Sequence, residues 1–364
     1  MTTSMSAFER VSLALRGLYQ SYGYRQYKVG KFETYDLYAR NRNFLSGEHI
    51  LTFSDIDGRL MALKPDVTLS IIKNTRDDSR TRKMWYTENV YRVPRNAYGF
   101  REIVQTGLEC IGEVDLYAMA EVLMLAARSL ETISPDYVLD LSHMGILTGV
   151  LDGCGASAPI SADVIAAFGE KNLHALRAVC EGGGLDADTV KLLEKLCVLG
   201  GPAAETLPQL LELPLPGAAR QAAEELRSLC DILNVFGAYR VNIDLSVTND
   251  TDYYNGVIFR GFVDGVAAGV LSGGRYDHLL HRMGRTGGAI GFAVYLSELE
   301  LLLSEKAAYD VDTLLVYDEG DDPARVAAAA QALTESGQTV RVQPAGEAAV
   351  TYRLMLHVGK GEIV

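Results

Sequence analysis

The sequence contains few of the features that build metal centres, disulfides or membrane spans. Its five cysteines and six histidines are scattered over 364 residues, and no C-x-x-C pair is present. No uncharged apolar run reaches the length of about 18 residues that a membrane helix needs, and the N-terminal residues lack the apolar core of a secretory signal. We therefore expect reduced thiols, no structural metal and a cytosolic protein.

Positive charge is also scarce, since 34 Lys and Arg stand against 47 Asp and Glu and the formal net charge is -13. Nucleic-acid binders gain most of their affinity when Lys and Arg displace counterions from phosphates. Stable binding of tRNA is therefore not expected.

Hydrophobic periodicity predicts an α+β protein with a mostly antiparallel sheet flanked by helices. Helices are expected at residues 8–22, 115–130 and 296–304, and strands at 60–63, 84–93, 103–111, 239–245, 257–262 and 266–271. Residues 150–235 are rich in Ala, Leu and Gly and predict a helical insertion. The main domain is expected to span residues 1–305, and a small α/β domain with a strand–helix–strand pattern to span residues 310–364.

Four segments carry polar side chains where periodicity alone would not place them. They are LKPDVT (63–68), the stretch from Tyr91-Arg92 to QTGLE (105–109), DYYNG (252–256) and GGRYD (273–277). Each has an ordinary structural interpretation: a helix cap at Asp66, a strand residue at Glu109, sheet packing by the tyrosines and a glycine turn. Their order, their spacing and their number argue against four coincidences.

Together these segments resemble the histidyl-tRNA synthetase family of the class II aminoacyl-tRNA synthetases. They correspond to its LRPE-type loop, motif 2, the RGLDYYTG histidine signature and the GGRYD strand. Residues 291–293 (GFA), followed by Leu296, resemble the start of motif 3. The resemblance covers roughly residues 6–305, interrupted by the helical insertion, and it implies the class II synthetase-like fold.

The ATP site departs from the family pattern. The motif 3 arginine falls at Glu298, the arginine that opens the histidine signature falls at Asn249, and the acidic residue of motif 2 is replaced at Pro94. A carboxylate repels a triphosphate, whereas adenylation needs positive charge on the phosphates. The resemblance therefore implies a chain without ATP activation, catalytic residues, a metal or a cofactor.

The amino-acid pocket retains the family pattern. By resemblance, Asp66 and Thr68 take the ammonium of histidine with Tyr276 nearby, and Gln105 and Arg92 hold its carboxylate. Glu109 and Tyr254 bond the two imidazole nitrogens, and Tyr253 belongs to the same signature. Asp66 stands where the family has glutamate, so the ammonium contact is expected to be longer or bridged by water.

The combination of features resembles the family of ATP phosphoribosyltransferase regulatory subunits. In that family a histidyl-synthetase paralogue, with an end domain too short to bind an anticodon, binds the short catalytic subunit and confers feedback inhibition by histidine. The resemblance implies a histidine effector and a self-dimer within a hetero-oligomer. A divergent histidyl-tRNA synthetase, and a paralogue that binds another small molecule or serves only as a scaffold, remain alternatives.

Overall fold

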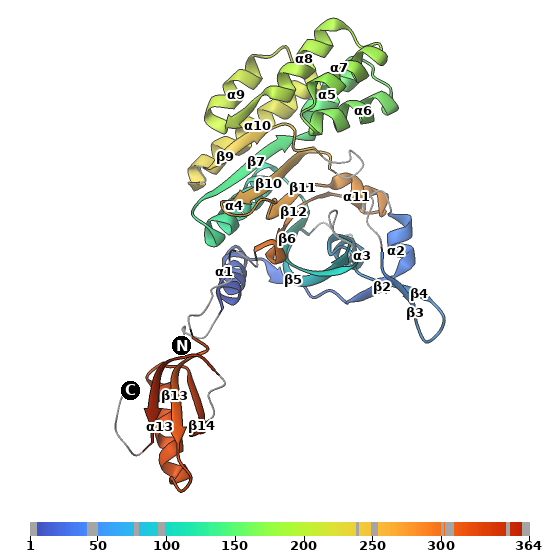
Figure 1. The fold of residues 1–364 in the computed structure, drawn as a ribbon. Coiled ribbons are helices and arrows are strands. Elements are labelled where there is room, and N and C mark those ends of the chain that lie inside the picture. The colour runs from blue at the N-terminus through green and yellow to red at the C-terminus, as the bar shows by residue number, and fades with distance from the viewer. Residues whose placement is uncertain are drawn as a thin grey trace. The chain divides into compact units, whose positions relative to one another are not determined.

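The chain divides into two compact units, a larger one from Val11 to Leu302 and a smaller one that contains the elements after residue 309 (Figure 1). The computed structural model describes residues 6–41, 50–75, 80–93, 99–237, 240–248, 254–299, 302, 309–346 and 350–358. Within these ranges, no helix combines the length and the apolar character needed to cross a membrane.

A nine-stranded sheet forms the centre of the larger unit, with the strand order β1-β5-β6-β12-β11-β10-β7-β9-β8. Its strands are β1 (Arg25–Gln26), β5 (Arg82–Arg92), β6 (Arg101–Gly112), β7 (Tyr137–His143), β8 (Gly200–Pro202), β9 (Val241–Asp244), β10 (Val257–Val263), β11 (Leu271–Arg275) and β12 (Gly288–Tyr295). The pairs β1–β5 and β7–β9 are parallel and the others antiparallel, which confirms the expected mostly antiparallel sheet.

Helices α1 (Ala7–Ser21) and α4 (Leu116–Ile133) cover one face of this sheet. Tyr19 of α1 packs edge-on against Phe292 of β12, and the Arg16 guanidinium lies over the ring of Trp85. Asp115 begins α4 by accepting a hydrogen bond from the Ala118 amide, as an N-cap residue does. Because side chains alternate along a strand, the neighbours of Trp85 and Phe292 in sequence face the opposite side.

The opposite face is covered by three short helices, α2 (Tyr35–Arg40), α3 (Thr68–Asn74) and α11 (Asp277–Arg282), and by a three-stranded sheet. That sheet has the order β2-β4-β3, formed by Phe32–Thr34, Leu60–Leu63 and Thr52–Ser54. The helices are six or seven residues long, too short for a periodic pattern. The sequence indicates only the start of α3, through the helix-cap interpretation of Asp66.

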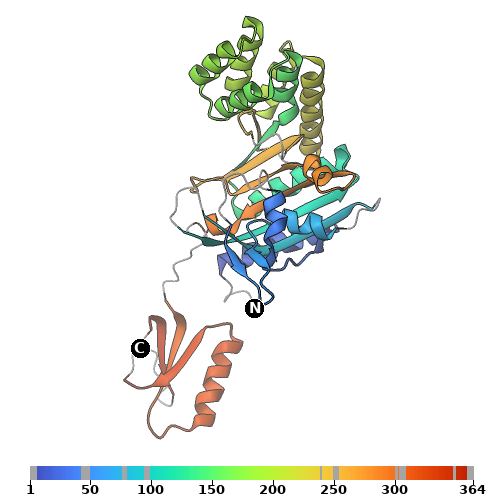
Figure 2. The same ribbon diagram turned by 90° about the vertical axis from the view of Figure 1, so that its right-hand side faces the viewer.

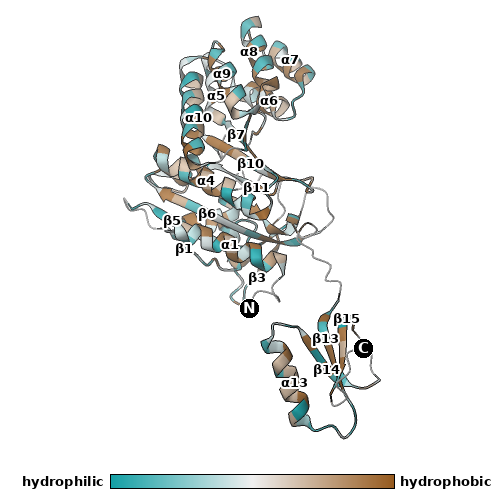
Figure 3. Ribbon diagram, turned by 90° about the vertical axis from the view of Figure 1, so that its left-hand side faces the viewer, coloured by the Kyte–Doolittle hydropathy of each residue, from teal (hydrophilic) through white to brown (hydrophobic). Residues whose placement is uncertain are grey.

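The predicted insertion is helical, but it begins and ends slightly outside the expected range of 150–235. It contains α5 (Met144–Gly153), α6 (Ala158–Gly169), α7 (Leu173–Gly182), α8 (Ala187–Val198), α9 (Ala203–Glu212) and α10 (Gly217–Phe236). Figures 1 and 2 show these helices gathered at the β7–β9 end of the sheet. In Figure 3 they carry both hydrophobic and hydrophilic residues, as expected for amphipathic helices packed on one another.

Two expected elements were placed incorrectly. The apolar run at residues 266–271 was expected to be a strand, but β11 begins only at Leu271, because Gly265 has a φ of 82° and opens the connection from β10. The expected helix at residues 296–304 begins as a short 3-10 helix, η2 (Leu296–Leu299), and most of the remainder lies outside the described residues.

The smaller unit is built from three parallel strands and one helix. Strand β13 (Val311–Tyr317) lies between β14 (Val340–Pro344) and β15 (Tyr352–His357), and α13 (Pro323–Glu335) connects β13 to β14. The strand–helix–strand pattern matches the one that the sequence predicts.

A buried ion pair fixes the segment that leads from the small sheet to α3. Lys64, at the end of β4, is fully buried, and its Nζ lies 2.6 Å from Glu88 Oε2 of β5. The other Glu88 oxygen accepts the Val29 amide, and the Lys64 carbonyl accepts the Tyr91 amide. These contacts hold residues 64–68 against the edge of β5.

We predict that Lys64→Met lowers the free energy of unfolding by about 3 kcal/mol, because it leaves the Glu88 carboxylate without its cation in a mostly buried place. Urea unfolding measures this change. Lys191→Met provides the control, since Lys191 is 69% exposed in its pair with Asp188 and should change stability little. Equal losses in the two variants would contradict the structural role of the buried pair.

Candidate functional site

A group of buried polar side chains lies on the sheet face that α3 and α11 cover. Its central member is Glu109 of β6, which is 2% exposed. Glu109 Oε1 accepts a hydrogen bond of 2.8 Å from Thr68 Oγ1, at the start of α3. Its Oε2 accepts one of 2.5 Å from the Tyr276 hydroxyl, which follows β11. Glu109 therefore contacts two other residues named from the sequence, Thr68 and Tyr276, which lie 41 and 167 positions away from it along the chain.

Glycines on the neighbouring strands make room for these side chains. Gly291 pairs with Glu109 in the sheet, and a Cβ at Gly291 would collide with the Glu109 carboxylate. Gly274 pairs with Gly291 on the next strand, and a Cβ there would lie 2.6 Å from the ring of Tyr254. The glycines of GGRYD and of motif 3 therefore form a flat strand surface under the site, and the alternative interpretation of GGRYD as a turn is wrong.

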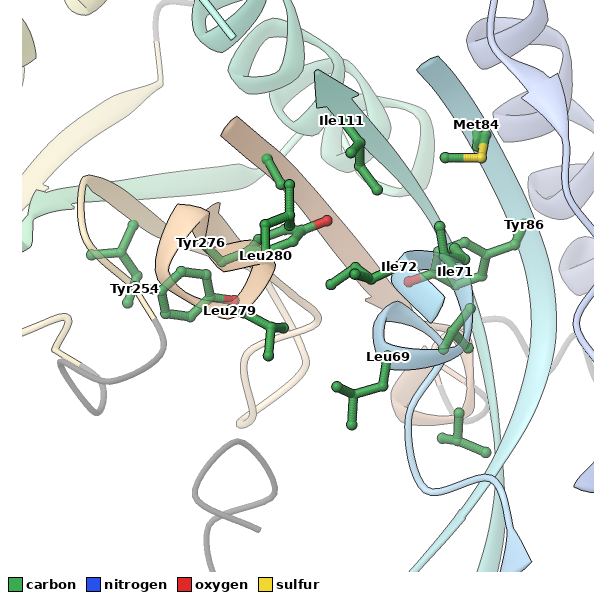
Figure 4. Packing of buried hydrophobic residues seen from close by; sticks show 14 of the residues in the cluster. Leu69, Ile71, Ile72, Met84, Tyr86, Ile111, Tyr254, Tyr276, Leu279 and Leu280 are labelled. Carbon is green, nitrogen blue, oxygen red and sulfur yellow. The ribbon is translucent and has the colours of Figure 1, made fainter. Parts of the chain in front are cut away.

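Hydrophobic side chains surround this polar group. Figure 4 shows Tyr254 and Tyr276 in one cluster with Leu69 and Ile72 of α3 and Tyr86 of β5. Tyr254 is 8% exposed and Tyr276 is 1% exposed. The polar groups at Glu109 are thus shielded from water, which strengthens every electrostatic interaction among them.

Burial raises the pKa of Glu109 to about 8. The hydrogen bonds from Tyr276 and Thr68 lower this pKa, and the negative charge of Asp66 raises it. Burial and the charge of Glu109 raise the pKa of Tyr276 well above its usual range, and the same two causes act on Tyr86. A cation placed beside Glu109 would favour the charged carboxylate, so the site is suited to a ligand that brings positive charge.

Asp66 and Arg92 lie at the edge of this group. Asp66 Oδ1 accepts a 2.8 Å hydrogen bond from the Leu69 amide, so Asp66 also acts at the start of α3 as the helix-cap interpretation predicted. The negative charge of Asp66 raises the pKa of both Glu109 and Tyr86, and the positive charge of Arg92 lowers the pKa of Tyr86. Asp66 and Arg92 therefore bring charges of opposite sign to the same site.

Gln105 precedes Glu109 by four residues in β6, so the two side chains lie on the same face of the sheet. Gln105 is 2% exposed. Among the residues that the structure describes, no atom accepts a hydrogen bond from Gln105 Nε2. A buried amide donor of this kind costs free energy unless an acceptor is present. Gln105 is thus a donor available to an anionic part of a ligand.

Three residues that the sequence analysis named lie outside the described residues: Tyr253 of the histidine signature, and Asn249 and Pro94 of the altered ATP site. Glu298 is described and lies exposed in η2, beside Ser297, whose hydroxyl accepts the Val104 amide of β6. No group of three or more His, Cys, Asp or Glu side chains within the described ranges is arranged to hold a metal ion.

Sequence reasoning missed a second set of polar contacts, next to the tyrosines. Asn255, Arg275 and Asp277 belong to the DYYNG and GGRYD segments, but no role was assigned to them. In the structure the Asp277 carboxylate accepts hydrogen bonds from Asn255 Nδ2, Arg275 Nε and the Ala289 amide. The three polar residues could have been noticed in the motifs, but one sequence does not show which of them form hydrogen bonds with one another across the chain.

Comparison with known proteins identifies the family of this chain. The family model described as histidyl-tRNA synthetase matches residues 3–299. The chain belongs to the histidyl-tRNA synthetase family. This confirms the resemblance drawn from the four segments and the class II synthetase-like fold.

Individual relatives divide between two kinds of protein. An ATP phosphoribosyltransferase regulatory subunit of Alkaliphilus metalliredigens is 28% identical, over 88% of this chain and 84% of its own. A solved structure from Bacillus halodurans, described as an ATP phosphoribosyltransferase regulatory subunit/histidyl-tRNA synthetase, has a TM-score of 0.83 and 22% identity over 96% and 93% of the two chains. A histidyl-tRNA synthetase from Nostoc has a TM-score of 0.75 and 18% identity over 93% and 82%.

We predict a pH dependence of stability that belongs to Glu109. Its pKa is about 8 in the folded protein and near 4.5 when exposed, so the folded state holds the proton more tightly. The stabilisation is complete below about pH 4.5 and is lost as the pH rises toward 8. Relative to Glu109→Gln, the wild type should lose about 1.4 kcal/mol of unfolding free energy per pH unit between pH 5 and 8.

Urea unfolding of both proteins at pH 6, 7, 8 and 9 measures this difference, which should level off above pH 8. A difference that stays constant over the whole range would show that Glu109 is charged in the folded protein throughout.

Proposed function

We propose that this chain is a non-catalytic regulatory subunit of ATP phosphoribosyltransferase in histidine biosynthesis. It binds histidine for feedback control and activates the short catalytic subunit. The observation that carries the proposal is the buried Glu109 carboxyl group, held by Thr68 and Tyr276 on a glycine surface.

Histidine fits the chemistry of the site around Glu109. Free histidine offers an ammonium, a carboxylate and an imidazole with one donor and one acceptor nitrogen. In its charged form, which a cationic ligand favours, Glu109 keeps an acceptor position on each oxygen after it has accepted from Thr68 and Tyr276, so it can bond an imidazole N–H. Tyr254, whose ring lies over Gly274, supplies a hydroxyl for the second ring nitrogen.

The two ends of the amino acid need groups of opposite charge. Asp66 and Thr68 lie together at the start of α3, and both offer oxygen acceptors to an ammonium. Gln105 Nε2 is a buried donor on the face that bears Glu109, and Arg92 adds positive charge at the end of β5. Tyr253 belongs to the same proposed pocket.

The names of the similar proteins support an ATP phosphoribosyltransferase catalytic subunit as the partner. Proteins named ATP phosphoribosyltransferase regulatory subunit match most of this chain, and a solved complex from Thermotoga maritima is described as ATP phosphoribosyl transferase (HisG:HisZ). That complex matches with a TM-score of 0.62 over 80% of this chain. We propose that this chain likewise binds a short catalytic subunit, as a self-dimer within a hetero-oligomer in the cytoplasm.

A divergent histidyl-tRNA synthetase is the second candidate, favoured by the family model itself. The exposed Glu298 argues against it, because it places negative charge where the family places an arginine on ATP. Asn249 and Pro94 remove further ATP-handling groups.

We predict that the pure protein catalyses no histidine-dependent exchange of pyrophosphate into ATP. Because at least two other groups are missing, Glu298→Arg alone should not restore the exchange. Radiolabelled pyrophosphate, with an active histidyl-tRNA synthetase as the positive control, measures it. Exchange above background by the wild type would support the synthetase instead.

We predict that histidine binds far better than leucine or phenylalanine, because these ligands leave the buried polar groups unpaired at about 1–3 kcal/mol per group. Glu109→Gln should weaken histidine binding tenfold or more, since a charge-assisted bond is lost. Tyr254→Phe should cost about 0.5–1.5 kcal/mol. Affinity should be highest between about pH 6.5, where imidazole gains its proton, and about pH 8, where Glu109 loses its own.

Calorimetry with a panel of amino acids measures these differences, with circular dichroism as the control for folding. Equal affinity of the wild type and Glu109→Gln for histidine would show that Glu109 only packs in the sheet. Tighter binding of another amino acid would identify a paralogue with a different ligand.

A further inference from the structure

We propose that Asp277 is a positioning residue, whose carboxylate fixes Tyr276 against Glu109 and Tyr254 over Gly274 and thereby sets the strength of histidine binding. The effect on histidine rests on the proposed function. The effect on the bond between Tyr276 and Glu109 does not depend on any ligand.

The Asp277 carboxylate joins three separate segments of the chain. Its Oδ2 accepts from Arg275 Nε at 2.8 Å and from Asn255 Nδ2 at 3.2 Å, and its Oδ1 accepts from the Ala289 amide at 2.9 Å. The Asp277 amide in turn donates to Asn255 Oδ1 at 2.9 Å. The end of β11, the segment before β10 and the start of β12 are thus held by one side chain that is 11% exposed.

These three segments are the ones that carry or support the two tyrosines. Tyr276 stands between Arg275 and Asp277, and its amide donates to the Ala289 carbonyl. Tyr254 precedes Asn255, whose amide donates to the Arg275 carbonyl, and the Tyr254 ring lies over Gly274. A shift of Asp277 would therefore move both rings relative to Glu109.

Substitution by asparagine breaks this arrangement without changing its shape. If the new amide oxygen accepts from Ala289, its NH₂ group faces the donors of Arg275 and Asn255. If the amide is reversed, its NH₂ group faces the Ala289 amide instead. In either orientation at least one donor meets another donor, which costs more than the loss of a single bond.

The first experiment observes Glu109 in the ligand-free protein. Carbon-13 NMR of carboxyl-labelled glutamate follows its titration, and Glu109→Gln identifies the signal. In the wild type the midpoint should lie near pH 8. In Asp277→Asn it should move to higher pH, because the Tyr276 hydrogen bond that lowers the Glu109 pKa is displaced, while Asp66, Thr68 and Tyr86 still face the carboxyl group.

A milder variant, Asn255→Ala, removes both hydrogen bonds between Asn255 and Asp277. It should move the midpoint of the Glu109 titration in the same direction, but by less. It decides the question if Asp277→Asn does not fold. An unchanged Glu109 titration in a folded variant would overturn the proposal, since a purely structural Asp277 would lower stability and leave Glu109 as it was.

The second experiment measures histidine affinity by calorimetry. Asp277→Asn should bind histidine about tenfold more weakly than the wild type. Asp244→Asn is the matched control, because Asp244 also accepts from a backbone amide, a side chain and a cation, at Ser246 and Lys171, and should stay within about twofold of the wild type.

The two experiments separate the proposals. A shifted Glu109 titration in a protein that does not bind histidine would remove the proposed function and keep the positioning role. Histidine binding that is equal in the wild type and Asp277→Asn, with Glu109 unchanged, would keep the proposed function and remove the positioning role.

Discussion

The buried Glu109 carboxyl group is the constraint on which the other features of the site depend. Burial costs its charged form free energy, which only partners can offset. Thr68 and Tyr276 supply two hydrogen bonds, and Gly291 supplies the space. A Cβ at Gly291 would collide with the Glu109 carboxylate and with the Leu108 carbonyl, so both contacts explain why a glycine occurs at that point of β12.

The fold delivers these groups from distant parts of the chain by fixing each segment independently. The ion pair between Lys64 and Glu88 holds the segment that carries Asp66 and Thr68 against β5. The hydrogen bonds of Asp277 hold the tyrosine segments on the other side. The site is therefore preorganised before any ligand arrives, which reduces the entropy lost on binding.

The larger features of the fold could be predicted from the sequence because their patterns are long. Strands β5 and β6 extend over eleven and twelve residues rich in apolar side chains, and helix α4 repeats its apolar positions over eighteen residues. Helices α2 and α11 were missed because six residues are too few to show a period. The start of β11 was misplaced because the apolar loop at residues 266–270 resembles a strand in its composition. Asp66, Thr68, Glu109 and Tyr276 could be proposed as site residues from the sequence because family motifs mark them. The partners Lys64–Glu88 and Asn255–Asp277 depend on contacts across the chain that local patterns do not encode.

We propose that Glu109 senses histidine on behalf of a separate enzyme. The most direct test is the rate of phosphoribosyl transfer by the short catalytic subunit mixed with this chain, measured as histidine is added. The wild-type chain should raise the rate, and histidine should then lower it. With Glu109→Gln the rate should rise equally, but the inhibition should require at least tenfold more histidine. Inhibition at the same histidine concentration with both chains would contradict the account.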